Sequence, residues 1–342
     1  YANLEENAVV SEGGEVSIPA SGESADDISR ASCDIDRGII LGGDLNIVRP
    51  HEYLNSLFIA ITLSNGSQQR ELSKRAQGKS VVHLHNSDLK AVKLFYPSYE
   101  EQSAIGSLFR TLDDLLASYK DNLANYRSLK TTMLSKMFPK AGQTVSEIRS
   151  DGFEGEWELL EINDLADDFQ SGGTPKTNVQ EYWDGDIPWI QSSDLETNCL
   201  FEIKVQKSIS EKGLKNSSAK IIPKDSIAVV TRVGVGKLVV MRHEYATSQD
   251  FLSLSNLKSN IEFTAYLLYR LLQKEVTQLQ GTSIKGITKV ELLSKKVLIP
   301  SLLEQQAIGS YFSNLDQLIT SYQEKITQLE TLKKKLLQDM FI

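Results

Sequence analysis

Two long segments of the chain, residues 97–138 and 300–342, repeat apolar side chains every three or four positions. This spacing places the apolar side chains on one face of a helix. Ser98-x-x-Glu101 and Ser301-x-x-Glu304 are typical of helix starts that are closed by a capping box. The pattern therefore predicts two long helices that form a helix pair or coiled coil, and the alternative is that each amphipathic helix packs on its own domain. Contacts between them are expected at Ile105, Leu112, Tyr119, Tyr126, Ile308, Leu315, Tyr322 and Leu329.

Outside these helices the apolar positions form shorter runs. Runs at 187–190, 226–231 and 237–241 suit β-strands, whereas 261–279 has helical spacing. The chain is therefore expected to be of mixed α/β class. The expected boundaries are 1–96 for a first α/β domain, 97–138 for a first spacer helix, 139–152 for a polar linker, 153–299 for a second α/β domain and 300–342 for a second spacer helix.

The two helical segments are copies of each other at a period of about 203 residues. Residues 97–138 align without a gap with 300–341, and about 19 of the 42 aligned positions are identical. A match of this kind indicates a tandem duplication, and it predicts two domains related by pseudo-two-fold symmetry. Residues 1–96 resemble only the second half of 153–299, so we expect about 50 residues of the first domain to be missing from its start.

Composition is compatible with a globular protein of two domains, with 40% hydrophobic and 24% charged residues. No apolar run approaches the roughly 18–20 residues of a membrane helix. Cys33 and Cys199 lie far apart without metal-type spacing, which suits the reducing cytoplasm. The net charge of −8 argues mildly against nucleic-acid binding, but a local basic patch on an acidic body can bind DNA equally well.

Several motifs occur in a fixed order along the duplicated chain. They are Pro-Ser-x-x-Glu-Gln at 97–102 and 300–305, Leu41-Gly42-Gly43-Asp44-Leu45-Asn46, Trp157-Glu158-Leu159, Gly172-Gly173-Thr174-Pro175-Lys176 and Ile187-Pro188-Trp189-Ile190. With this organisation, essentially the whole chain resembles the specificity subunit of type I restriction–modification systems.

The resemblance implies two target-recognition domains that each read one half of a split site in double-stranded DNA. It implies that the repeated helices form an antiparallel coiled coil that separates these domains and docks two methyltransferase subunits, which restriction subunits can join. It also implies that the chain has no catalytic residues and no cofactor of its own. S-adenosylmethionine, ATP and Mg²⁺ are then expected on the partner subunits only.

A local excess of basic residues between 204 and 242 is the expected DNA-binding surface. Loop 231–237 is the best candidate to enter a groove, because its glycines permit close backbone approach and Arg232 can contact guanine with two hydrogen bonds. The candidate DNA contacts are Arg232, Lys237, Arg242, Lys204, Lys207, Lys176, Thr174 and Gln191 in the second domain, with Ser21 and Arg30 in the first. A solvated hairpin with incidental charges is the alternative interpretation of this surface.

Two other functions stay open at this point. A coiled-coil scaffold without DNA affinity explains the helices but gives no role to the basic residues. A metal-dependent nuclease could use Asp186, Glu202 and Lys204, although this triplet explains neither the repeat nor the helices. We expect no metal site, and we expect Trp183 and Trp189 to be core residues rather than partners of a flipped base.

Overall fold

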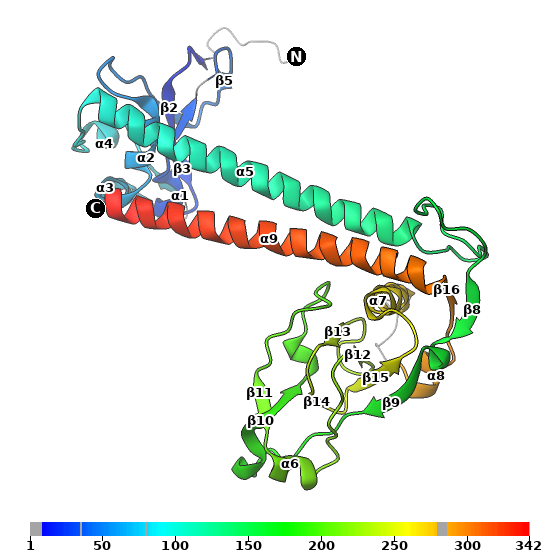
Figure 1. The fold of residues 1–342 in the computed structure, drawn as a ribbon. Helices are drawn as coiled ribbons and strands as arrows, with labels where there is room; N and C mark the ends of the chain where they lie inside the picture. Colours follow the sequence, from blue (N-terminus) through cyan, green and yellow to red (C-terminus); the bar gives the residue numbers. More distant parts are fainter. Residues whose placement is uncertain (1–8, 35, 79–80, 279–285, 342) are drawn as a thin grey trace. The chain divides into compact units, whose positions relative to one another are not determined.

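The computed structural model describes residues 9–34, 36–78, 81–278 and 286–341, and the chain forms two compact units (Figure 1). Unit 1 consists of Tyr1–Leu123 with Tyr322–Ile342, and unit 2 consists of Ala124–Ser321. The two long helices are α5 (Tyr99–Lys136) and α9 (Leu302–Met340). Each of them therefore lies partly in unit 1 and partly in unit 2. The outermost residues of the expected domain 1–96 and helix 300–342, and the last residue of the 261–279 pattern, lie outside the described residues.

Unit 1 is built from short strands and helices around one apolar core. Its central sheet has the order β4-β2-β6 and is antiparallel, and β1-β5 and β3-β7 form two further pairs. The elements before α5 are β1 (Val9–Val10), β2 (Glu15–Pro19), β3 (Ser21–Gly22), α1 (Ala25–Ile28), β4 (Ser32–Asp34), β5 (Ile40–Leu41), β6 (Leu45–Val48), α2 (Ser56–Leu63), α3 (Gly66–Arg75), β7 (Val82–His83) and α4 (Asn86–Lys90).

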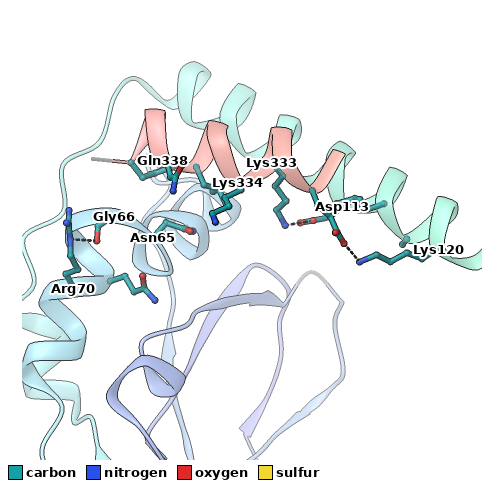
Figure 2. A pocket seen from close by; sticks show the side chains of 14 residues that line it. Asn65, Gly66, Arg70, Asp113, Lys120, Lys333, Lys334 and Gln338 are labelled. Carbon is teal, nitrogen blue, oxygen red and sulfur yellow. Dashed lines mark hydrogen bonds and ion pairs between the residues drawn. The ribbon is translucent and has the colours of Figure 1, made fainter. Parts of the chain in front are cut away.

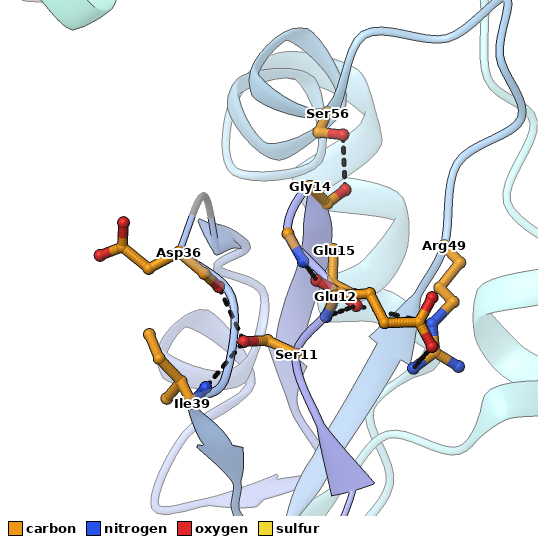
Figure 3. Close-up of polar contacts among 9 residues, drawn as sticks. Ser11, Glu12, Gly14, Glu15, Asp36, Ile39, Arg49 and Ser56 are labelled. Atoms are coloured by element: carbon orange, nitrogen blue, oxygen red, sulfur yellow. Dashed lines mark hydrogen bonds and ion pairs between the residues drawn. The ribbon is translucent and has the colours of Figure 1, made fainter.

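A buried carboxylate closes the turn before β2 (Figure 3). Glu15 is 2% exposed and accepts hydrogen bonds from the backbone N–H groups of Glu12 and Gly13, at 2.7 and 2.9 Å. Arg49 lies 3.6 Å away. The Glu12 N–H group lowers the pKa of Glu15 most, burial opposes this effect, and the Gly13 N–H group and the charge of Arg49 lower the pKa further.

Unit 2 centres on an antiparallel sheet of order β13-β12-β15-β9, with a second sheet of order β11-β10-β14 and the pair β16-β8. Ile227 and Val229 of β12 enter one core cluster and Ala228 and Val230 another, so both faces of this strand are buried. The elements are β8 (Glu158–Glu161), β9 (Ala166–Ser171), β10 (Trp183–Ile190), β11 (Lys207–Ile209), α6 (Glu211–Lys215), β12 (Ser226–Val230), β13 (Leu238–Met241), β14 (Ala246–Thr247), β15 (Phe251–Leu257), α7 (Ile261–Gln278), α8 (Lys289–Leu293) and β16 (Lys296–Ile299), with short 3₁₀ turns at Ile162–Leu165, Gln180–Tyr182 and Ser192–Asp194.

The sheets of the two units repeat one topology. The order β4-β2-β6 corresponds to β13-β12-β15, but β9 extends only the sheet of unit 2 among the described residues. Residues 93–96 align with β16, yet only β16 has a partner strand in the described part of the chain. Tyr96 is consequently 49% exposed, whereas its counterpart Ile299 is 7% exposed. The strands β8 and β9 come from the part of 153–299 that residues 1–96 do not repeat.

The repeated openings of α5 and α9 attach each helix to the start of a neighbouring helix. The Gln305 side-chain oxygen accepts a hydrogen bond from the Asn260 backbone N–H at 2.9 Å, and its amide nitrogen donates to the Pro300 carbonyl at 2.9 Å. In unit 1, Gln102 makes the equivalent bond to Asn55 at 2.9 Å. Both asparagines cap the helix that follows them, α7 or α2. The repeated glutamine is therefore a buried structural residue.

The capping box expected at the start of α9 is only half formed. The Ser301 hydroxyl accepts the Glu304 N–H at 3.4 Å, as expected. The Glu304 carboxylate is buried and, in place of the backbone bond, accepts two hydrogen bonds of 2.7 Å from Arg149. The capping-box prediction was therefore wrong for this carboxylate, because an arginine of the 139–152 linker satisfies it better.

Within each unit the halves of α5 and α9 run antiparallel. In unit 1, Asp113 pairs with Lys333, and the rings of Tyr119 and Tyr322 lie 5.2 Å apart. Among the expected coiled-coil residues, Leu112, Ile308 and Leu315 are buried, and Ile105, Tyr119, Tyr126, Tyr322 and Leu329 are half-buried. The expected fold class, two α/β units with two long antiparallel helices, is confirmed.

The buried face of each helix differs in detail from the expected apolar stripe. A spacing of three residues from Leu112 and Leu315 places Leu115 and Leu318 in the stripe as well, but they are 40% and 37% exposed. Their neighbours Leu116 and Ile319 are 7% and 9% exposed. Where two adjacent residues are apolar, the spacing alone does not determine which one faces the core.

Both helices end in a Met-Phe pair whose phenylalanine enters a core. Phe138 is fully buried in unit 2, with ring centroids 5.4 Å from Phe263 and 6.2 Å from Phe312. In unit 1 the corresponding Phe341 is 8% exposed. A side chain on Gly66 would overlap with the Phe341 backbone, so the break between α2 and α3 at this glycine makes room for the end of α9.

Candidate nucleic-acid interface

Three loops of unit 2 leave its central sheet at the same edge. The last residue of β12, Val230, lies opposite Phe251 at the start of β15, and Ser171 at the end of β9 lies opposite Leu252. Because neighbouring strands are antiparallel, the loops at these strand ends are adjacent. The loops are 172–176, 231–237 and 248–250, and the segment 286–289 packs beside them.

Hydrogen bonds connect these loops to one another. The Thr174 hydroxyl donates to the side-chain oxygen of Gln249 at 2.5 Å, and the Thr231 N–H donates to the Asp250 carbonyl at 2.8 Å. The Ile287 N–H in turn donates to the Thr231 carbonyl at 2.7 Å. The loops therefore form one fixed surface.

Arg232 lies at the centre of this surface. Its side chain is exposed and forms no ion pair with any described residue. It borders a depression of about 350 Å³ together with Gln249, Thr288 and Lys289. An exposed guanidinium with free N–H groups can donate two parallel hydrogen bonds to a planar acceptor such as guanine.

The two other basic candidates near this loop are engaged within unit 2. The Lys237 ammonium donates to the carbonyl of Leu195 at 2.7 Å and more weakly to that of Ser192 at 3.4 Å. Arg242 pairs with Asp225 at 3.1 Å and also with Glu262. Lys237 thus holds its loop in place, and much of the Arg242 charge is neutralised.

The remaining basic candidates of unit 2 are exposed. They are Lys204, Lys207 and Lys176, and the Lys207 ammonium lies 5.7 and 6.0 Å from the ring centroids of Trp183 and Trp189. The indole N–H of Trp183 donates to the Lys176 carbonyl at 3.2 Å. Trp189 is 3% exposed and packs in a core cluster, as expected for a structural aromatic residue.

The polar candidates have local partners. Besides the Thr174 bond to Gln249, the backbone N–H and side-chain amide of Gln191 donate to Asp194, at 3.1 and 3.4 Å. In unit 1 the Ser21 hydroxyl donates to Asp44 at 2.5 Å. Arg30 is exposed between α1 and β4, in the connection that corresponds to loop 231–237 of the repeated sheet.

Sequence reasoning missed Gln249 and Lys289 at this surface. Gln249 keeps its amide N–H groups available, because Thr174 binds its oxygen. The Lys289 ammonium donates to the Phe169 carbonyl at 3.0 Å. Neither residue belongs to a motif, and both reach the surface only because antiparallel pairing brings distant loops to one edge.

The three loops lie in a part of the chain that matches a known family. The family model described as type I restriction modification DNA specificity domain matches residues 154–331, more than half of the chain. The chain belongs to this DNA specificity family. The matched residues of the specificity chain include all three loops, the segment 286–289 and the first part of α9.

Individual relatives agree with this assignment. The specificity chain is 28% identical over 194 residues to the type I restriction enzyme MjaIX specificity subunit of Methanocaldococcus jannaschii, covering 55% of this chain but only 44% of that subunit. It is 22% identical over 314 residues to the putative type I restriction enzyme MjaX specificity subunit of the same organism, covering 87% and 70%. A type I S subunit of M. genitalium has the same fold, with a TM-score of 0.63 at 17% identity, covering 96% of this chain and 83% of that one.

The structure gives no support to a nuclease site at Asp186, Glu202 and Lys204. Across residues 9–34, 36–78, 81–278 and 286–341, no three or more His, Cys, Asp or Glu side chains gather as metal ligands. In the same part of the specificity chain, no helix combines the length and apolar character needed to span a membrane.

Proposed function

We propose that this chain reads a split sequence in double-stranded DNA and directs the methyltransferase and restriction subunits of a type I system to it. The observation that supports this most is that the family match contains the three adjacent loops with the exposed Arg232 at their centre. Unit 2 reads one half-site, and unit 1 reads the other near Ser21 and Arg30. A duplicated reader suits a target with two separated halves.

Recognition combines a specific and a non-specific contribution. Arg232 donates two hydrogen bonds to the O6 and N7 atoms of a guanine, with Thr174 and Gln249 as polar neighbours. Lys204, Lys207 and Lys176 neutralise phosphates and fix the register of the protein on the duplex. The phosphate contribution releases counterions, so DNA affinity falls steeply as the salt concentration rises.

The long helices offer a surface for the methyltransferase subunits. Leu115 and Leu318 occupy equivalent positions of the repeat, as do Leu129 and Leu332, and these four side chains are 37–46% exposed. Exposed apolar residues at repeated positions suit two copies of one partner. We assign no catalytic step to the chain. S-adenosylmethionine, ATP and Mg²⁺ belong to the partner subunits, and the complex acts in the cytoplasm.

The test is a map of methylated bases in DNA from cells that produce the chain with its methyltransferase partner. The wild-type chain should give modified adenines in a split motif. Arg232→Ala should abolish or relax one half of that motif, since loss of a bidentate guanine contact costs about 1–3 kcal/mol of discrimination. Arg242→Ala is the matched control, because Arg242 is already paired with carboxylates, and it should leave the motif unchanged.

Two results would contradict the proposal. A complex that forms but methylates no split motif would favour a coiled-coil scaffold without DNA affinity. Cleavage of DNA by the purified chain in the presence of Mg²⁺ would revive the nuclease hypothesis.

A further inference from the structure

Unit 1 contains an open groove of about 970 Å³ between α3 and the halves of α5 and α9 that belong to this unit (Figure 2). Leu116, Leu337 and Phe341 form its apolar part. Figure 2 shows the Lys333–Asp113 ion pair at its side, with Lys334 nearby. The groove is thus apolar inside and charged around the rim.

In unit 2 the equivalent ion pair is covered by a side chain of that unit. Lys130 and Asp316, 2.5 Å apart, are the repeat counterparts of Lys333 and Asp113. Tyr266 of α7 covers this pair: its hydroxyl donates to Asp316 at 2.7 Å, and the Lys130 ammonium lies 5.6 Å from its ring centroid. Unit 2 therefore shows which chemical group fits over such a pair.

Unit 1 lacks this group. Ile61 takes the place of Tyr266, because both residues follow the capping asparagine, Asn55 or Asn260, by six positions. Isoleucine has no hydroxyl to donate to Asp113. Ile61 packs against the apolar core of unit 1, so the Lys333–Asp113 pair at the side of the groove has no tyrosine of its own unit over it.

The rim of the groove carries an excess of positive charge. Lys120 pairs with Glu330 at 2.7 Å, and Lys333 pairs with Asp113. Arg70 and Lys334 also line the groove, are exposed, and form no ion pair with a described carboxylate. An occupant that carries carboxylates near its aromatic ring would complement these two cations.

We propose that this groove binds an acidic, tyrosine-bearing segment of a partner protein. The tyrosine ring lies over Lys333 as Tyr266 lies over Lys130, and its hydroxyl donates to Asp113. Neighbouring carboxylates of the segment pair with Arg70 and Lys334. This site uses residues of unit 1 only and does not depend on DNA reading by unit 2, so either function can fail while the other holds.

The probe is a fluorescently labelled random copolymer of glutamate and tyrosine, with polyglutamate of equal length for comparison, and binding is measured by anisotropy. The full chain should bind the copolymer at least about tenfold more tightly than polyglutamate. Ile61→Tyr supplies from within unit 1 the hydroxyl that covers the equivalent pair of unit 2, so it should weaken copolymer binding about tenfold or more, whereas Ile61→Leu should not. Arg70→Glu combined with Lys334→Glu should weaken it similarly. Lys335→Glu is the matched control, because Lys335 is exposed beside Lys334 but does not line the groove.

Three outcomes would overturn the proposal. Equal binding of polyglutamate and copolymer would reveal a surface that attracts any polyanion. Equal loss with Lys335→Glu would show that general charge, not the groove, holds the copolymer. If duplex DNA displaces the copolymer from the wild-type chain but not from the Arg70/Lys334 variant, these two cations bind DNA instead. If Ile61→Tyr does not fold, the two surface variants decide the question.

Discussion

Replacing Phe341 by alanine should destabilise unit 1 and leave unit 2 unchanged. Phe341 is 8% exposed, and its ring centroid lies 6.1 Å from those of both Phe58 and Phe109. A phenylalanine buries about 200 Å², which at about 25 cal/mol per Å² corresponds to roughly 5 kcal/mol. Phe→Ala changes in cores cost about 3–5 kcal/mol. We expect a loss of about 3 kcal/mol, because the unfolded chain already buries part of this area.

Hydrogen exchange followed by mass spectrometry measures this effect separately in each unit. Phe341→Ala should accelerate exchange in α2 and in β2, which share a core cluster with Phe341. The matched variant Phe138→Ala should accelerate exchange in α7 and leave α2 unchanged, because Phe138 packs against Phe263 in unit 2. Both variants remove the same group from the same position of the repeat.

Unchanged exchange of α2 in Phe341→Ala would refute the reasoning, since the end of α9 would then contribute nothing to the unit 1 core. Equal acceleration in both units would refute it differently. The aromatic ends would in that case support one global unfolding transition rather than the core that each contacts.

Three further experiments test the packing described above. Asp316→Ala should lower the free energy of unfolding by about 3–5 kcal/mol, because it leaves the 8%-exposed Lys130 unpaired. Asp113→Ala, at the exposed equivalent pair, should lower it by less than about 1 kcal/mol. Equal losses for the two variants in chemical denaturation would contradict this. Gln305→Leu should cost about 2 kcal/mol by leaving the Asn260 N–H and Pro300 carbonyl unsatisfied, while Gln306→Leu, at an exposed neighbour, should be nearly neutral in the same assay. The pKa of Glu15 is lower in the folded state than in the unfolded chain, so its stabilising effect is complete above the ordinary glutamate pKa and is lost as pH falls through the lowered value. Glu15→Gln should therefore make the stability of unit 1 depend less on pH in the acid range. An unchanged pH dependence would assign it to other carboxylates.

The long helices and the duplication could be predicted from the sequence, because both depend on local periodicity and on identity between two segments. The positions of α5 and α9 agree with the expected segments 97–138 and 300–342 to within two residues at each described end. The buried face was less predictable. Leu115 and Leu116 are both apolar, and only the tertiary structure determines that Leu116 turns inward.

The charged candidates show a second limit of sequence reasoning. Lys237, Arg242 and Arg232 lie close together in the sequence, and all three were candidate DNA contacts, with Arg232 the candidate for guanine. In the structure, Lys237 binds backbone carbonyls and Arg242 binds two carboxylates, and only Arg232 keeps its donors for a ligand. These partners come from residues 192–195, 225 and 262, whose approach depends on strand pairing and not on spacing along the chain.

For the same reason the repeat motif is a poor guide to the proposed DNA contacts. Its glutamine, glycine and terminal phenylalanine are repeated because each has a fixed packing partner, and none of them lies in the three loops around Arg232. The loops differ between the units because they are free of that constraint.

Each unit takes the phenylalanine at its core from the end of a helix that begins in the other unit. An exchange of reading surfaces between family members should therefore transfer Ala124–Ser321 as a whole. A transplant limited to 153–299 would separate Phe263 from the matching Phe138 and would be expected to fold less stably.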